Sequence, residues 1–359
     1  MPKVTSEKVS TRLVALDYLR GFFIVVIIID HLARWPSVLA FISGKALLWV
    51  TAAEGFVIIS GLLVGYVRGY KNKSLSMKEV SKKLISRGLL LYVWSIIATV
   101  AYTAIIWYIP LMGGAPGIMI DKGEWFELLA NTFTLNYTYV WVHFLAFYAL
   151  FLVASPIAIW LLRSSKAWLV VALSLLLLVV GWQTHIDALQ WQALFFIPSV
   201  AGYYLEPIKS KWQSLSKHTK NMLVRAAWGL TAITIVLSVV STFYSSSFTD
   251  IADTINDGLF AKDTISIWRL MLAFMWFIGF VLLFQRFEKW IGKFFGWLLL
   301  PIGTRSLTAY ILHGIAIVLI SYFTIAVDNI LVNTLLGIIA ILIVWAILRI
   351  PLINKIIPR

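Results

Sequence analysis

The sequence predicts an all-α, polytopic membrane protein with about ten transmembrane helices and both termini on the cytoplasmic side. Apolar residues make up 61% of the 359 positions, against roughly half in an ordinary globular domain. They gather in runs of about 20 residues, which is the length a helix needs to cross the hydrocarbon layer. Lys and Arg residues are concentrated in alternate loops and are scarce in the loops between them. Backbone groups in lipid must hydrogen-bond to one another, so these runs are helices.

Ten apolar runs qualify as membrane spans, and no composition break suggests a separate soluble domain. We therefore predict a single integral-membrane domain over 1–359. The spans are expected near 13–32, 45–67, 84–109, 138–162, 167–183, 190–206, 222–243, 265–287, 298–325 and 330–350. The first run follows basic residues, as a signal sequence does, but it lacks a small-residue cleavage site and carries charges. We interpret it as a retained helix.

The distribution of positive charge predicts the orientation. With the N-terminus inside, 23 of the 30 Lys and Arg residues fall in cytoplasmic loops and tails, as the positive-inside rule requires. The net charge of +14 therefore reflects topology and contact with anionic membrane lipids, and we expect no nucleic-acid partner. For the basic run from Arg68 to Arg87, two interpretations stay open: binding of lipid headgroups, or a share in binding an anionic cytosolic ligand. The outer loops hold four cations: Arg34, Lys45, Lys122 and Lys262.

Several kinds of chemistry lack their residues. The chain has no cysteine, which excludes disulfides and thiolate catalysis. Its five histidines stand on separate segments without a metal-ligand spacing, so we predict no metal site. No phosphate-binding glycine loop or nucleophile elbow occurs. The chemistry must then come from ionisable groups inside the spans, which are costly there and usually mark function.

Span one carries the most informative set. Arg20 and His31 are eleven positions apart, so on a helix they lie within about 20° of one face and roughly 16 Å apart along the axis. Asp17 stands three residues before Arg20 and can pair with it. The alternative is a structural Asp17–Arg20 pair with an interfacial histidine.

Topology sorts the buried polar groups into two layers. An outer layer holds His31, Glu54, His143, Arg269 and His313. An inner layer holds Arg20 and Arg305. The glycines that follow Glu54 are explained by close helix packing. For His143 and for His313, a structural hydrogen bond is an equally good explanation.

These residues resemble a known enzyme family. Leu16-Asp17-Tyr18-Leu19-Arg20-Gly21, with ten residues between Arg20 and His31, is similar to the opening signature of the membrane acyltransferase-3 superfamily. Other stretches resemble its OpgC branch, which is named for the succinylation of osmoregulated periplasmic glucans. They are Asp30-His31, Ala53-Glu54-Gly55-Phe56-Val57-Ile58-Ile59-Ser60-Gly61, Trp191-Gln192-Ala193-Leu194-Phe195-Phe196, and Gly303-Thr304-Arg305-Ser306-Leu307 with His313 downstream.

The resemblance implies an acyltransferase in the plasma (inner) membrane. Such an enzyme takes a succinyl or acetyl group from cytosolic acyl-CoA, which is a co-substrate and not a bound cofactor. It delivers the group to a hydroxyl of an extracytoplasmic glycan or lipid-linked sugar. In this picture Arg20, Asp17 and Arg305 bind the donor. The superfamily's Arg-x-x-Arg pair on the third helix has only Lys83 and Arg87, at a spacing of four, as its counterpart here.

Roles in catalysis follow from the same resemblance. His31 would be the general base, because its ordinary pKa lies near neutrality. Glu54 would orient the ring of His31, and Arg269 would stabilise the oxyanion. Four secondary candidates are Asp30, His143, Gln192 and His313. Direct transfer and an acyl-histidine intermediate both remain open.

Two other functions compete with this interpretation. In a transporter or a lipid or glycan flippase, the buried charges would line a translocation path. A catalytically inactive scaffold or receptor would keep the fold alone. A transferase differs from both in needing a narrow donor passage that leads from the cytosolic side to His31.

Overall fold

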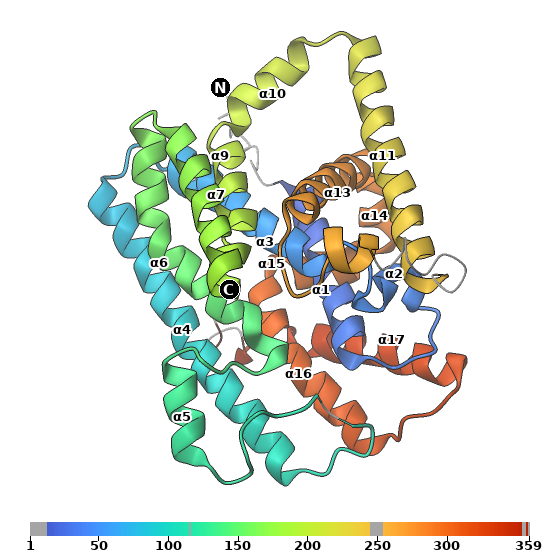
Figure 1. Ribbon diagram of the computed structural model, residues 1–359. Helices are drawn as coiled ribbons and strands as arrows, with labels where there is room; N and C mark the ends of the chain where they lie inside the picture. The colour runs from blue at the N-terminus through green and yellow to red at the C-terminus, as the bar shows by residue number, and fades with distance from the viewer. Residues whose placement is uncertain (1–12, 115, 245–253, 354–356, 358–359) are drawn as a thin grey trace, which may run out of the picture.

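The computed structural model describes residues 13–114, 116–244, 254–353 and 357, and within these ranges every regular element is helical (Figure 1). In the described part of the chain, eight stretches are long and apolar enough to cross a membrane. They are α3 with η2 (Ala52–Leu63, Val64–Lys71), α4 (Met77–Tyr108), η3 with α6 (Val140–Val142, His143–Arg163), α7 (Ala167–Thr184), α11 (Lys217–Phe243), α13 (Ile267–Arg286), α16 (Ser306–Phe323) and α17 (Ile330–Ile347). The chain is therefore an all-α, multi-pass membrane protein, as predicted.

The other two predicted spans also correspond to helices, but of different character. α1 (Val14–Leu32) has the length of a span and carries three charged residues. The predicted span 190–206 is divided among α8 (Asp187–Trp191), α9 (Ala193–Tyr203) and α10 (Leu205–Ser214), with Pro198 inside α9. Proline removes a backbone donor, which weakens a continuous helix. Short elements complete the fold: α2 (Ala40–Ser43), η1 (Gly44–Ala46), α5 (Trp125–Phe133), η5 (Thr254–Leu259), α14 (Glu288–Phe294) and α15 (Gly296–Thr304).

Polar caps mark where several helices begin. Ser76 accepts a hydrogen bond from the backbone of Glu79, whose side chain bonds back to Ser76, and this capping box starts α4. Ser216 caps α11 and Ser266 caps α13: each hydroxyl accepts a hydrogen bond from the backbone N–H three residues later, without a return bond. These caps fix where the three helices begin.

Small residues let α1 and α3 approach their neighbours closely. A Cβ at Gly21 would lie 2.2 Å from the carbonyl oxygen of Leu299, so α1 and α15 touch backbone to backbone. A Cβ at Gly61 would lie 1.9 Å from the carbonyl oxygen of Phe195, which joins α3 to α9. This is the usual role of glycine at helix contacts in membranes. α1 lies in the middle of the bundle, among α3, α13, α15, α16 and α17 (Figure 1), so its polar side chains face protein.

Candidate active site

α1 carries both residues of the predicted signature on one continuous helix. Since α1 is unbroken from Val14 to Leu32, Arg20 and His31 share a face and lie roughly 16 Å apart along the axis. Ala33 adopts a left-handed conformation (φ 50°) and its N–H bonds to the carbonyl of Ile29, which ends the helix. His31 therefore stands in the last turn, at the end opposite Arg20.

His31 meets a second histidine from α16. Its Nδ1 lies 2.7 Å from Nε2 of His313, and the two ring centroids are 4.9 Å apart. On the other side of its ring, Nδ1 of His313 lies 2.5 Å from the carbonyl oxygen of Tyr310. A carbonyl oxygen only accepts, so Nδ1 of His313 donates to it, and Nε2 of neutral His313 accepts from Nδ1 of His31. In the neutral pair, Nε2 of His31 keeps its lone pair and can take a proton.

The two histidines differ in exposure, and this separates their roles. The side chain of His313 is fully buried (0% exposed), whereas His31 retains part of its accessible surface. α16 is held in place beside them, because the hydroxyl of Tyr102 donates to the carbonyl of Ile311 at 2.6 Å. A buried, fixed ring behind a partly exposed one is suited to orienting it.

Two buried donors lie next to α16. A Cβ at Gly314 would come within 2.8 Å of the Trp141 ring and within 2.5 Å of the Tyr102 ring, so glycine lets both rings pack against α16 at the residue after His313. The Tyr139 ring lies 5.0 Å from that of Trp141. The indole N–H of Trp141 and the hydroxyl of Tyr139 are buried without a hydrogen-bond partner among the residues that the structure describes. A buried unpaired donor is costly, and such groups often serve a ligand.

Glu54 and Arg269 form a buried ion pair. Glu54 is 0% and Arg269 3% exposed. Nε and Nη2 of Arg269 lie 2.8 and 2.5 Å from Oε1 of Glu54. The other carboxylate oxygen, Oε2, accepts from the backbone N–H and the hydroxyl of Thr51 at 3.0 and 2.5 Å, which caps α3. The pair joins the start of α3 to α13.

These contacts differ from the predicted roles of both residues. His313, not Glu54, makes the ring hydrogen bond to His31. Arg269 directs Nη1 to the carbonyls of Ala261 and Lys262 at 2.8 and 3.0 Å, so its donors hold Glu54 and the preceding loop. Glu54 is held in the first turn of α3 by its own capping box, and Arg269 occupies its other oxygen. The sequence placed Glu54 and Arg269 in one layer and did not predict that they pair with each other.

The inner end of the α1 face is strongly basic. Nη2 of Arg20 donates to the hydroxyl of Ser306 at 2.6 Å, and its guanidinium lies 5.9 Å from the centre of the Phe56 ring. Arg87 of α4 lies within electrostatic range of Arg20 and of Arg68 in η2. From the sequence, Arg68 and Arg87 counted only as part of a basic loop. The placement of Arg87 beside Arg20 is the signal that the sequence alone did not supply.

A small cavity lies among α3, α6 and α16. Its volume is about 10 Å³, roughly the space of one water molecule. The Phe56 ring borders it and contacts both Arg20 and Tyr310, and the Tyr310 ring lies 5.4 Å from that of His313. The cavity is lined by Phe56, Val57, Ser60, Phe144, Leu145, Tyr148, Phe151, Leu307 and Tyr310.

The comparison with protein families is decisive for the identity of the chain. The family model described as OpgC protein matches residues 12–351. The chain belongs to the OpgC family. No curated protein and no solved structure matches it. Membership of the OpgC family implies a membrane-bound acyltransferase, and the matched range includes every candidate site residue named above.

Several residues that drew attention to the OpgC family serve packing in this fold. Gln192 bonds through Oε1 and Nε2 to the hydroxyl and carbonyl of Ser174, at 2.9 and 2.7 Å, and so fastens α8 and α9 to α7. Nη1 of Arg305 donates to the carbonyl of Leu348 at the end of α17. Ser306, the next residue, is the one that touches Arg20. Arg305 thus holds the end of α17, and its predicted role in donor binding stays a prediction.

Asp17, Asp30 and His143 are the remaining candidate residues of the OpgC chain. Asp17 is in the first turn of α1, within electrostatic range of Arg20. Asp30 accepts hydrogen bonds from the side chain of Ser43 and the backbone of Ala46. Nδ1 of His143 lies 2.5 Å from the hydroxyl of Thr138, which gives this histidine a local structural partner.

Proposed function

We propose that this OpgC protein transfers an acyl group from cytosolic acyl-CoA to a hydroxyl of a glycan or lipid-linked sugar on the outer side of the plasma membrane. The observation that carries the proposal is the hydrogen-bond chain from His31 through His313 to the carbonyl of Tyr310. It leaves one nitrogen of a partly exposed histidine ready to accept a proton, as general base catalysis of acyl transfer requires.

The reaction follows from this arrangement. Nε2 of His31 takes the proton of the acceptor hydroxyl while the hydroxyl oxygen attacks the thioester carbonyl. The imidazolium of His31 is stabilised by its hydrogen bond to His313, which in turn is fixed by Tyr310. The C–S bond then breaks, and the sulfur of CoA leaves with the proton returned from His31. The products are an ester and free CoA. An acyl-histidine intermediate uses the same nitrogen as nucleophile.

The arginines at the inner end suit the donor. Arg87 lies within electrostatic range of both Arg20 and Arg68, and guanidinium groups bind phosphate oxygens in a planar fork. CoA carries its phosphates at one end and its thioester at the other. With the phosphates at these arginines, the pantetheine arm would follow the narrow cavity from Phe56 towards Tyr310 and His313. Passage of an acyl chain requires the rings of Phe56 and Tyr310 to turn aside.

The developing oxyanion needs a donor other than Arg269. We assign this role to the indole N–H of Trp141, which is buried beside Gly314 and has no partner in the described part of the chain. Loss of one oxyanion donor typically lowers kcat by about 10²–10³-fold. Trp141→Phe keeps most of the packing and removes this N–H, so transfer should fall while thermal stability stays near that of the parent. Unchanged transfer would remove Trp141 from the mechanism.

A transporter or flippase fits these observations less well. Such a protein needs one site that opens to each side in turn, whereas this chain carries Arg20 and the His31–His313 pair at opposite ends of α1, with only a small cavity beside Phe56 and Tyr310. Membership of the OpgC family also favours transfer over transport. The proposed donors are succinyl-CoA or acetyl-CoA.

The test is transfer by the purified protein in nanodiscs. Labelled succinyl-CoA and acetyl-CoA are offered separately with a mixture of cell-envelope glycans, and the products are read by mass spectrometry. A mass gain on a sugar, with release of one free CoA for each ester formed, supports the proposal and identifies the acyl group. Movement of unmodified glycan or lipid across the bilayer without any ester would overturn it.

A further inference from the structure

A large cavity lies on the other face of α1. Its volume is about 710 Å³, within the range of roughly 300–1,000 Å³ that is typical of ligand sites. It is bounded by α1, α2, the start of α3, α11 and α13. Val26 lines it and stands five residues before His31, which places it about 140° around the helix from that residue. This cavity is therefore separate from the proposed reaction centre.

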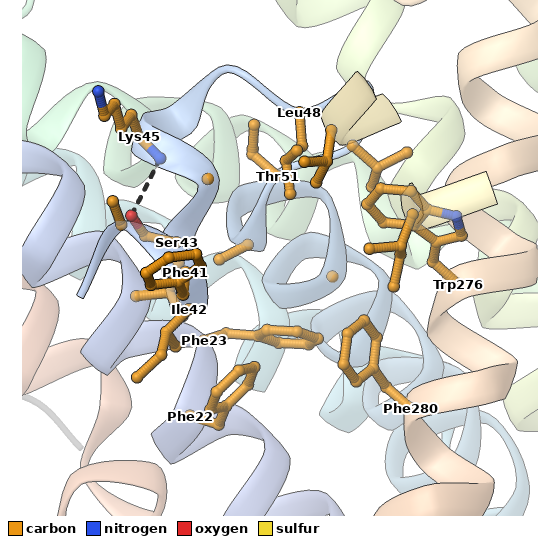
Figure 2. A pocket seen from close by; sticks show the side chains of 18 of the residues that line it. Phe22, Phe23, Phe41, Ile42, Ser43, Lys45, Leu48, Thr51, Trp276 and Phe280 are labelled. Atoms are coloured by element: carbon orange, nitrogen blue, oxygen red, sulfur yellow. Dashed lines mark hydrogen bonds between the residues drawn. The ribbon is translucent and has the colours of Figure 1, made fainter. Parts of the chain in front are cut away.

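The lining of the cavity is mainly apolar, with Ser43, Lys45 and Thr51 among its polar residues. Figure 2 shows the rings of Phe22, Phe23 and Phe280 on one side and Trp276 on another. Close packing is the rule inside proteins, and apolar cavities exclude water. A space of this size between membrane helices is suited to a hydrocarbon chain.

The cavity also reaches the outer surface of the protein. Phe41 and Ile42 of α2 line it and are 92% and 49% exposed. Exposed apolar side chains at the end of a span lie among lipid chains. A chain from the surrounding bilayer can therefore enter beside α2 without crossing water.

The rim of the cavity carries a cation. Lys45 lines it, and its ammonium group lies 5.6 Å from the centre of the Phe243 ring and 5.9 Å from that of the Trp35 ring. In Figure 2 its side chain extends from the rim away from the rings of Phe22, Phe23 and Phe280. A lysine above an apolar space matches a lipid with an anionic headgroup, because the hydrocarbon chain and the phosphate are then both satisfied.

We propose that this cavity binds one acyl chain of an anionic phospholipid of the outer leaflet, with the lipid phosphate at Lys45. The lipid fills the space behind Phe22 and Phe23 on α1. It thereby supports the helix whose other face presents Arg20 and His31. This site does not depend on the proposed acyl transfer.

The experiment counts bound lipid by native mass spectrometry. Protein from nanodiscs with equal amounts of phosphatidylglycerol and phosphatidylethanolamine is transferred to mild detergent. The parent should retain one phosphatidylglycerol. Ile235→Trp fills the cavity from α11, and its matched control Ile233→Trp places the same ring two residues away on the exposed face of α11. Ile235→Trp should lose most of the lipid, and Ile233→Trp should keep it.

Two more variants test the rim and guard against misfolding. Ala40→Trp blocks the cavity from the short helix α2, where a local change leaves the bundle intact, and should also lose the lipid. Lys45→Glu should exchange phosphatidylglycerol for phosphatidylethanolamine, whereas Lys122→Glu in another outer loop should not. Equal retention by the two isoleucine variants, an isoprenyl phosphate in place of the phospholipid, or an unchanged lipid in Lys45→Glu would each overturn the proposal. His31 variants that lack transfer should retain the lipid, so this site and the proposed reaction fail or stand independently.

Discussion

Nδ1 of His31 lies 2.7 Å from Nε2 of His313, although 282 residues separate them in the chain. The carbonyl of Tyr310 fixes the proton on the far nitrogen of His313. The direction of both hydrogen bonds follows, and with it the nitrogen of His31 that is left to act as a base.

His31→Ala should lower acyl transfer by at least about a hundredfold, since general base catalysis contributes typically 10²–10⁴-fold. His31 is partly exposed at the end of α1, so the variant should fold and keep the thermal stability of the parent. The measurement is transfer from labelled acyl-CoA in nanodiscs, with the exposed His218→Ala as control. A well-folded His31→Ala protein with full transfer would refute the assignment.

His313 should matter through His31 and not by itself. His313→Ala should lower transfer by roughly ten- to a hundredfold, because the base loses its orienting partner. His313→Gln keeps an acceptor for Nδ1 of His31 and should recover part of the rate, and the double variant with His31→Ala should be no slower than His31→Ala alone. The sequence ranked His313 with His143, and the structure now places it higher. Additive losses in the double variant would show that His313 acts separately.

Arg20→Ala should weaken acyl-CoA binding by about tenfold or more, equivalent to about 1.4 kcal/mol. Arg20→Lys should weaken it less, because an ammonium keeps the charge and loses the planar fork. Binding is measured directly with a non-transferable acyl-CoA analogue, and the exposed Lys78→Ala serves as control. If Arg20→Ala binds the donor as the parent does, its contact with Ser306 is purely structural.

Glu54 and Arg269 should govern stability. Glu54→Gln leaves the buried guanidinium without its carboxylate, and breaking such a pair typically costs about 3–5 kcal/mol. The variant should therefore melt at a clearly lower temperature in detergent. Replacing both partners, as Glu54→Leu with Arg269→Met, should restore much of the loss. A Glu54→Gln protein of parental stability that fails in transfer would instead return Glu54 to the reaction.

The orientation rests on the charge distribution and is open to a direct test. A reporter fused after Arg359 should read cytoplasmic, and a reporter inserted at Asp263 should read external, because most Lys and Arg residues then lie inside. Reporters need only whole cells and two compartment-specific assays. Reversed signals would contradict the N-in orientation and would place Arg20, Arg68 and Arg87 towards the outer side.

The sequence by itself determined the features that depend on neighbouring residues. Apolar run length located the spans. The alignment of Arg20 and His31 on one face follows from helical geometry alone. Positive charge in alternate loops indicated an orientation. None of these inferences needs to know which helix lies beside which.

Only the tertiary structure decided the partners. Hydropathy shows that a side chain is buried but not which helix meets it, because in lipid the contacts are chosen by shape and by small residues distant in the chain. Close approach at Gly314 and at Gly21 sets α16 and α15 against their neighbours. That packing joins His31 to His313 and Glu54 to Arg269, and brings Arg87 within electrostatic range of Arg20.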